Sequence, residues 1–207
     1  MRPSMVLACA AFGLVQARAV VSQDKTDTFD DLPDTGGHLV GDPPRFTTDG
    51  GINYDNFEYF SKGEGTNSLT GIEAHSYPNL AIVRKPAKGS FVAMGKCFTL
   101  KKLYFGCTPL SNEAEFNVPL PCQMDLSAYD AAGTLLGTQS ANFTPNGLAS
   151  DMNVAEIHLP PAKVIKVSAK LVGLPTGEGE AVTGLLMDDV TYTQHDNVED
   201  CCEGNWD

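Results

Sequence analysis

Alternation of apolar and polar side chains is the feature that most constrains how this chain can fold. From Ile165 onward, the segment KVIKVSAKLV (residues 163–172) has an apolar side chain at every second position and lysine or serine between them. Successive side chains of a β-strand point to opposite faces, so this pattern predicts a strand with one buried face and one solvent face. The inward set is Ile165, Val167, Ala169 and Leu171, and the outward set is Lys166, Ser168 and Lys170.

Other segments repeat this period. CQMDLSAYD (122–130) places Gln123, Asp125 and Ser127 outward, AAG then reverses the chain, and TLLGTQSANFT returns as the second strand of a hairpin. No segment has the period of an amphipathic helix. Further strand-like segments, punctuated by Gly and Pro, lie at 24–32, 52–60, 69–75, 79–85, 90–95, 98–106, 114–118, 151–159 and 185–192. Together they predict an all-β fold, an antiparallel β-sandwich of the jelly-roll type, with a β-barrel as the alternative.

The first residues have the composition of a secretory signal peptide. Arg2 precedes a short apolar run, and Ala17-Arg18-Ala19 fits the cleavage pattern of two small residues around a variable one. The apolar run is too short to span a bilayer, so we expect no membrane insertion. We therefore predict a secreted, extracellular protein with three parts: a signal peptide (1–19), a single β-sandwich domain (20–194) and an irregular acidic, cysteine-containing tail (195–207).

The strongly negative charge of the chain limits its partners. The 207 residues include 14 Lys and Arg against 26 Asp and Glu, a net charge of −12 at pH 7. Cleavage after Ala19 removes two arginines and no acid, which takes the net charge to −14. Such a charge disfavours nucleic acid and anionic membranes as partners. It is compatible with solubility outside the cell and with binding of a divalent cation.

The cysteines predict disulfides, because exported chains form them. Cys107 and Cys122 bracket a loop-like segment, and a bridge between them would stabilise the fold by about 3 kcal/mol. A strand of ten residues would hold Cys97 about 33 Å from Cys107, so we expect Cys97 to pair with Cys201 or Cys202 in the tail. The mature chain has five cysteines, and the odd one either stays free or forms an intermolecular disulfide.

One N-glycosylation sequon, Asn142-Phe143-Thr144, is present. In an exported protein it predicts an exposed position and a glycoprotein. Pro145 follows the sequon directly and is expected to lower its use.

Paired carboxylates occur near both ends of the predicted domain. Asp30 and Asp31 lie in TFDDLP, and Asp188 and Asp189 lie in LLMDDVTY. The first and last strands of a sandwich often lie side by side, which would bring both pairs into one neighbourhood. Like charges at close range need a cation, and calcium takes six to eight oxygen ligands. The four acids therefore predict one structural calcium. The alternative is that they accept hydrogen bonds from turn backbones or pair with Arg45 or Arg84.

Asp188 is the most constrained of these acids. If Val190 and Tyr192 face the core, strict alternation turns Asp188 inward as well. A buried carboxylate must be hydrogen-bonded, paired or metal-bound, because burying it alone is costly. We therefore expect Asp188 to have a dedicated partner.

Several motifs, taken in order, resemble those of a group of small secreted fungal proteins without a settled activity. They are TFDDLP, INYDNFEYF, PN-x-A, F-x-L-x-x-x-Y-x-GC, a second cysteine before AYD-x-x-G, and LL-x-DDV-x-Y. The FDDL and DDV-x-Y strands also resemble the terminal strands of galactose-binding-like jelly rolls, the fold of many carbohydrate-binding modules. The resemblance covers most of the mature chain. It implies that fold, and a structural calcium between the terminal strands.

Motifs of common enzymes are not found. The four histidines are far apart and lack zinc-site spacing, and there is no G-x-S-x-G nucleophile motif. The aromatic segment INYDNFEYF is the best candidate for a surface on which sugar rings stack, with about half of its rings expected in the core. The candidate ligand-binding residues are Tyr54, Tyr59 and the single tryptophan, Trp206.

The sequence favours a secreted, non-catalytic β-sandwich that binds a carbohydrate or a cell surface. One alternative is an extracellular lyase or glycosidase that acts on polysaccharide, since 26 acids are enough to contain a catalytic pair. Another is a secreted effector that binds a host protein. The fold by itself does not distinguish these functions.

Overall fold

The computed structural model describes residues 23–34, 46, 51–61, 71–83, 87–109, 118–173, 183–196 and 201. The predicted signal peptide, the 114–118 strand, Cys202 and Trp206 lie wholly or mostly outside these residues. The strands of the described part are β1 Asp24–Asp27, β2 Ile52–Asp55, β3 Glu58–Ser61, β4 Ile72–Glu73, β5 Asn79–Val83, β6 Lys88–Ala93, β7 Cys97–Pro109, β8 Cys122–Tyr129, β9 Leu135–Phe143, β10 Ser150–Asp151, β11 Asn153–Glu156, β12 Val164–Leu171 and β13 Thr183–His195.

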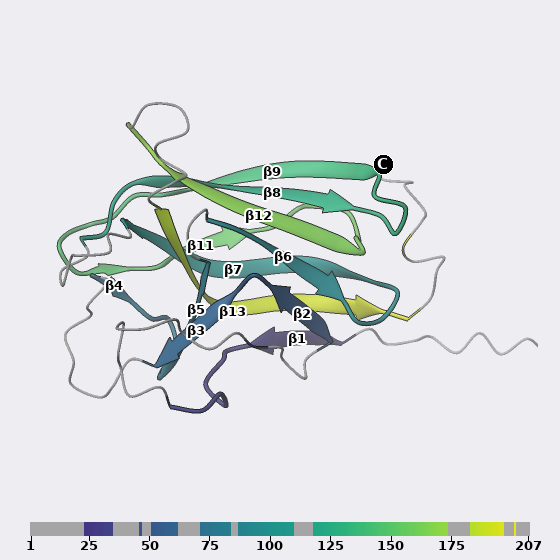
Figure 1. Cartoon of the computed structure of the whole chain (residues 1–207), viewed down its shortest axis with the longest axis horizontal. Coiled ribbons are helices and arrows are strands. Elements are labelled where there is room, and N and C mark those ends of the chain that lie inside the picture. Colours follow the sequence, from purple (N-terminus) through teal and green to yellow (C-terminus); the bar gives the residue numbers. More distant parts are fainter. Residues whose placement is uncertain are drawn as a thin grey trace, which may run out of the picture.

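Two antiparallel sheets form the molecule (Figure 1). One has the order β11-β7-β13-β5-β3, with β1 added along β13, and the other has the order β2-β6-β12-β8-β9. A short parallel pair, β4 with β10, is hydrogen-bonded to neither of these sheets. The predicted antiparallel β-sandwich is therefore confirmed. The hairpin predicted from CQMDLSAYD is the β8–β9 pair, whose turn Asp130 caps by accepting N–H bonds from Ala132 and Thr134.

The first strand lies beside the last, as expected for the two acid-bearing ends. β1 pairs antiparallel with β13, with Asp27 opposite Val190. Asp27 also accepts hydrogen bonds from the Tyr54 hydroxyl at 2.7 Å and the Tyr192 hydroxyl at 3.5 Å. This contact joins β1 to both sheets, since Tyr54 lies on β2 and Tyr192 on β13.

The core lies between the inner faces of the sheets and contains a cluster of aromatic rings. Its members, with ring centroids 5.1–5.5 Å apart along the chain of contacts, are Phe29, Phe46, Tyr54, Phe57, Tyr59 and Phe91. The 52–60 segment was expected to bury about half of its rings, as one strand would. It instead forms two strands in different sheets, with a corner at Asn56, whose φ is 64°. Rings on both sides of the segment therefore reach the core.

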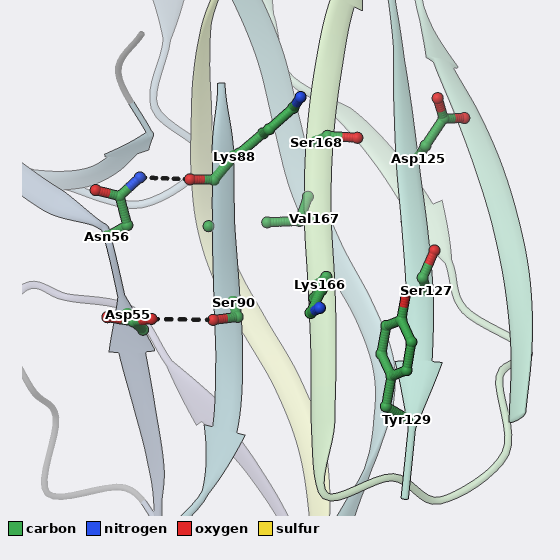
Figure 2. A pocket seen from close by; sticks show the side chains of 11 residues that line it. Asp55, Asn56, Lys88, Ser90, Asp125, Ser127, Tyr129, Lys166, Val167 and Ser168 are labelled. Carbon is green, nitrogen blue, oxygen red and sulfur yellow. Dashed lines mark hydrogen bonds between the residues drawn. The ribbon is translucent and has the colours of Figure 1, made fainter. Parts of the chain in front are cut away.

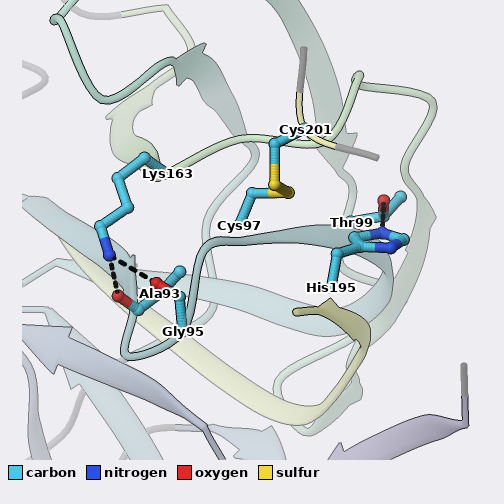
Figure 3. The surroundings of a disulfide bond; sticks show 7 residues. All are labelled: Ala93, Gly95, Cys97, Thr99, Lys163, His195 and Cys201. Atoms are coloured by element: carbon cyan, nitrogen blue, oxygen red, sulfur yellow. Dashed lines mark hydrogen bonds between the residues drawn. A yellow bond between two sulfur atoms is a disulfide. The ribbon is translucent and has the colours of Figure 1, made fainter. Parts of the chain in front are cut away.

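Two disulfides join cysteines of the described residues, both with partners that the sequence had suggested. Cys107–Cys122 joins β7 of one sheet to β8 of the other, and Cys97–Cys201 ties the tail to the start of β7. Figure 3 shows the second bridge near a turn at the end of β6. There Lys163 donates hydrogen bonds to the carbonyls of Ala93 and Gly95, both at 2.7 Å. Between the two partners left open for Cys97, the structure selects Cys201.

A search of the described residues for a helix of membrane-spanning length and apolarity finds none.

A substitution at Gly89 of β6 tests how tightly the core packs beneath the five-stranded sheet. A Cβ at this position would lie 2.6 Å from Phe57 Cε2, and the Phe57 ring is fully buried. We expect Gly89→Ala to lower the free energy of unfolding by about 1–3 kcal/mol in urea denaturation, because the core cannot take up the added methyl without a shift. Gly147→Ala is the matched control, since its nearest atom would be 3.4 Å away. Equal stability of the two variants would contradict this packing.

Candidate functional site

Cross-strand register arranges the outward side chains of the five-stranded sheet in rows. Ser90 of β6 lies opposite Asp55 of β2 and Lys166 of β12, and Lys166 lies opposite Ser127 of β8. Paired residues of antiparallel strands point to the same face. The first row is Asp55, Ser90, Lys166, Ser127 and Thr138, and the second row is Lys88, Ser168, Asp125 and Ser140. Every member of both rows is polar or charged.

A hollow of about 360 Å³ lies over these rows, on the solvent side of β2, β6, β12 and β8. Figure 2 shows the side chains rising from neighbouring strands around it. Its lining combines hydroxyls, an amide, two ammonium groups, two carboxylates and one phenol ring. The lining residues are Asp55, Asn56, Lys88, Gly89, Ser90, Asp125, Ser127, Tyr129, Lys166, Val167 and Ser168. We name this feature the sheet-face hollow.

Asp125 is held at one end of the sheet-face hollow by several donors. Its Oδ1 accepts hydrogen bonds from Gln123 at 2.6 Å and from the Ser140 hydroxyl at 2.5 Å, and Lys170 lies 3.7 Å from its Oδ2. Partial burial alone would raise the pKa of Asp125, but the Ser140 and Gln123 hydrogen bonds and the Lys170 charge together lower it below its usual value. Asp125 is therefore an ionised and locally neutralised hydrogen-bond acceptor.

Tyr129 and Lys166 form the second fixed part of the hollow. The Lys166 ammonium lies 4.6 Å from the centroid of the Tyr129 ring, a cation–π contact between two neighbouring strands. At the opposite end, the Ser90 hydroxyl donates to Asp55 at 3.4 Å. The hollow thus has an aromatic ring near one end and hydroxyl and carboxylate groups along its floor.

The two carboxylates of the hollow do not have the geometry of a glycosidase pair. Asp55 lies on β2 and Asp125 on β8, with β6 and β12 between them. Three strand spacings put the two backbones about 14 Å apart, whereas the catalytic carboxylates of glycosidases lie within about 5–10 Å of each other. Asp125 also turns toward Ser140 on the outer strand, away from Asp55.

Asp188 lies at a second polar site, on the other sheet, and the prediction that it faces the core is wrong. Met187 pairs with Phe105 on the inner face, and Asp188 pairs with Tyr104 on the outer face. The register shifts directly after Asp188, where Asp189 has a φ of 45°. This β-bulge adds one residue to the strand, so Val190 and Tyr192 return to the core while Asp188 does not.

The carboxylate of Asp188 is buried on the outer face because residues 71–78 cover it. Asp188 has no exposed surface, and its Oδ2 accepts the backbone N–H of Ser76 at 2.7 Å. Its Oδ1 accepts the N–H of Asp189 at 2.9 Å and the Ser76 hydroxyl at 3.1 Å. Burial raises the pKa of Asp188 to about 7, with a further rise from the Asp189 charge, while the Ser76 N–H bond acts against both. This is the hydrogen-bonded alternative to a metal site.

Asp189 holds the same covering segment through His75. Asp189 Oδ2 lies 2.5 Å from His75 Nδ1, and Asp189 Oδ1 lies 3.0 Å from the Ser76 hydroxyl, whose single proton Asp188 and Asp189 share. The His75 ring stacks on Tyr104, with centroids 3.5 Å apart, and 44 % of its side chain is exposed. We name the contacts of Asp188 and Asp189 with His75 and Ser76 the bulge clasp.

The other acid pair has different partners. Asp30 accepts the backbone N–H of Asn79 at 3.4 Å, and Asp31 is exposed. The Asn79 amide donates to the carbonyls of Phe29 and Leu32, which fixes the turn after β1. Within the described ranges, no three His, Cys, Asp or Glu side chains gather where they could hold a metal ion. Calcium at Asp30, Asp31, Asp188 and Asp189 stays a prediction.

Two of the three aromatic residues chosen from the sequence, Tyr54 and Tyr59, lie in the core. Tyr54 and Tyr59 are only 3 % and 6 % exposed, because the corner at Asn56 turns both rings into the core. Trp206 and Cys202 lie outside the described residues. Sequence reasoning did place Lys166, Ser168, Asp125 and Ser127 on outward faces, but it did not single them out. Tyr129 was missed because its strand position alone gave no sign that a lysine of the next strand lies over it.

Comparisons with known proteins support the fold. No protein-family model and no curated protein matches the sequence. A solved structure of a DUF4465 family protein from Bacteroides caccae has 12 % identity and a TM-score of 0.57, over 84 % of this chain and 100 % of that chain. A DUF4465 family protein from Bacteroides ovatus has 12 % identity and a TM-score of 0.41, over 83 % and 94 %. TmCBM61, solved in complex with β-1,4-galactotriose, has 12 % identity and a TM-score of 0.32, over 69 % and 87 %.

Asp188 gives the protein a defined pH dependence. Its folded-state pKa of about 7 exceeds the ordinary value of 3.8, so the folded protein binds this proton more tightly than the unfolded chain does. The resulting stability is complete below about pH 4 and is lost as pH rises through 7. We expect a loss on the order of a few kcal/mol in urea denaturation between pH 4 and pH 8, and a flatter profile in Asp188→Asn.

Asp130 provides the control for this experiment. It is an exposed turn acceptor, and hydrogen bonds led by the Thr134 N–H lower its pKa, so Asp130→Asn should leave the decline between pH 4 and pH 8 in place. The same measurement with millimolar calcium tests the metal prediction. A bound cation would keep Asp188 ionised and remove the decline, so an unchanged decline would contradict calcium binding there.

Proposed function

We propose that the chain is a secreted, non-catalytic protein that binds a carbohydrate, free or on a cell surface, across the sheet-face hollow. The observation that carries the proposal is the chemistry of the two rows. Hydroxyls, an amide, ammonium groups and carboxylates line one open depression on a rigid sheet. Sugars present many hydroxyl groups that both donate and accept hydrogen bonds, and such a lining can match them without a deep cavity.

Tyr129 adds an apolar surface to this lining. Its ring is half-buried at the edge of the hollow and is held by the Lys166 ammonium. A ring fixed in this way offers a flat face or edge against which the apolar side of a sugar can pack. Tyr129 takes the role that the sequence analysis had given to Tyr54 and Tyr59.

The positions and the pKa of the acids in the hollow are consistent with binding and not with catalysis. A general acid for glycosidic cleavage needs a raised pKa, and the pKa of Asp125 is lowered. The strand spacing between Asp55 and Asp125 also separates them too far to act on one bond. Product assays on a polysaccharide panel test the enzyme alternative directly.

Secretion is supported by the disulfides and the leader. Bridges such as Cys97–Cys201 and Cys107–Cys122 persist in oxidising compartments. The leader sequence at 1–19 would send the chain there. The competing proposal is that the protein is a secreted effector that binds a host protein. A pull-down on insoluble polysaccharides distinguishes this function from glycan binding.

Tyr129→Ala tests the proposed surface. We expect it to weaken binding to any polysaccharide retained in the pull-down about tenfold, equivalent to about 1.4 kcal/mol, since it removes the ring and loosens Lys166. Affinity is measured by calorimetry, with thermal unfolding as a check on folding. Tyr77→Ala, at a tyrosine that is 56 % exposed on the segment over the other sheet, is the matched control. Equal losses in both variants, or no polysaccharide bound at all, would overturn the proposal.

Asn142 tests the proposed export. Asn142 is exposed on β9, the edge strand of the five-stranded sheet. We expect protein from a eukaryotic secretion host to carry one N-glycan at partial occupancy, seen as a mass loss after N-glycosidase treatment. Thr144→Ala should abolish this glycan. An unmodified wild-type mass would contradict the prediction.

A further inference from the structure

One long segment of this acidic chain carries no charge. Residues 131–150 contain no Asp, Glu, Lys or Arg, although such residues make up 19 % of the chain and the net charge is −12. The centre of this segment is β9, the last strand of the five-stranded sheet, which runs along the upper side of the molecule in Figure 1. Every residue of β9 except Phe143 keeps surface exposed to solvent. The sheet therefore presents one long, uncharged edge.

The other edge strands of the two described sheets are built differently. Each has four residues and contains at least one acid: β1 is DKTD, β2 is INYD, β3 is EYFS and β11 is NVAE. Short length and charged side chains are usual means by which proteins keep edge strands from pairing with other chains. β9 has nine residues and neither a charge nor a proline, so it lacks these protections.

The hydrogen bonds of the neighbouring strands show which backbone groups of β9 face outward along the sheet. The Val172 N–H, just after β12, donates to the Pro121 carbonyl, just before β8. Backbone groups of successive strand residues point to opposite sides, so odd-numbered residues of β8 bond to β12 and even-numbered ones bond to β9. Their partners on β9 are the odd-numbered residues of 137–143. The even-numbered residues of this range therefore direct their N–H and C=O groups out of the sheet.

Thr138 and Ser140 form the open part of this edge. Both are exposed, and their outward N–H and C=O groups have no hydrogen-bond partner within the part of the chain that the structure describes. On one side, the pairing of β9 with β8 shifts register before Gly137. On the other side, the Asn153 side chain donates to the Asn142 carbonyl at 3.4 Å. The open stretch is therefore short and centred on one residue, which suits a symmetric contact.

We propose that β9 pairs antiparallel with β9 of a second copy of this chain, around a two-fold axis at Gln139. Thr138 of each copy then lies opposite Ser140 of the other. Each of these pairs exchanges two backbone hydrogen bonds, so the outward N–H and C=O groups of both residues are satisfied. The contact uses the same strand on both copies, so it closes at a dimer and does not extend into a fibre.

The charge distribution favours a second copy as the occupant of this edge. Two molecules with a net charge of −12 repel each other, and they approach with least repulsion through an uncharged surface. Asp125 on β8 accepts the Ser140 hydroxyl at 2.5 Å and has the Lys170 ammonium at 3.7 Å, so it adds little charge beside the edge. A basic or acidic partner would find no complementary charge on 131–150.

The pairing has a consequence for the arrangement of the sheet-face hollows. Antiparallel neighbours related by a two-fold axis present the same sheet face, so both hollows open on one side of a continuous sheet. Five strand spacings separate β12 of one copy from β12 of the other, a distance of about 24 Å. With the proposed glycan binding, one polysaccharide chain then engages both hollows and binds with higher apparent affinity. The association itself does not depend on that function.

Thr138→Lys tests the pairing. It places a like charge on both strands of the paired edge, and lysine is a natural means of blocking edge strands. It also reduces the net negative charge, so a loss of association cannot come from stronger repulsion between whole molecules. Leu148→Lys is the matched control, because it makes the same charge change in the same uncharged segment, at a side chain that is 80 % exposed beyond β9. All proteins carry Thr144→Ala and Cys202→Ser, which remove the glycosylation sequon and the odd cysteine.

Association is measured without ligand by sedimentation equilibrium, from about 1 µM to about 1 mM protein. We expect the parent and Leu148→Lys to approach the mass of a dimer within this range, and Thr138→Lys to associate at least tenfold more weakly. Amide hydrogen exchange at Thr138 and Ser140 should slow as the parent concentration rises, because the dimer bonds these N–H groups. Thermal unfolding shows whether each variant folds.

Several results would refute the inference. The parent may not remain a monomer at about 1 mM, and its dimer must be lost in Thr138→Lys and kept in Leu148→Lys. Protection that rises with concentration elsewhere and not at 138–140 would place the contact on another surface. If Thr138→Lys does not fold, the exchange rates of the parent decide the question. Because no experiment here uses a glycan, the dimer can fail while binding at the hollow stands, and the reverse.

Discussion

Each sheet buries one face against the other, and the two-residue period of a strand then determines what its second face presents. On β12 the inward residues Ile165 and Val167 are buried, so Lys166 and Ser168 must point to solvent. Antiparallel register aligns these outward residues with those of β6 and β8. The polar rows of the sheet-face hollow are therefore a direct consequence of core burial, and the core keeps them in place on a rigid support.

At the bulge around Asp189, β13 leaves this period. The bulge lets the strand bury Met187 before it and Tyr192 after it, while Asp188 turns to the outer face. Two acids there would be unfavourable without partners, and Ser76 and His75 supply them. The clasp in turn holds residues 71–78 over Gly106 of β7. A Cβ at Gly106 would lie 2.9 Å from the Ile72 side chain, so this segment packs closely on the strand. A local irregularity of one strand thus fixes a whole covering segment.

The two polar sites lie on different sheets and differ in how far they are exposed to solvent. The bulge clasp is largely buried, and its hydrogen-bond donors point at the protein's own carboxylates. Its contacts therefore hold the covering segment to the sheet. The sheet-face hollow is open, and its central lysines and serines face solvent. The disulfide between β7 and β8 joins the two sheets.

The sequence by itself determined the features that depend on local period and on short-range chemistry. Alternation at 122–130 and 163–172 predicted strands with the correct outward residues, and cysteine spacing predicted the bridge of Cys107 with Cys122. Tertiary structure decided the remaining features, because those features depend on which strands are neighbours. Tyr54 was expected to be a ligand contact, but a corner between the sheets turned it into the core, and a bulge turned Asp188 out of it. Lys88 and Ser168 are 80 positions apart in sequence, and only the pairing of β6 with β12 puts them in one row.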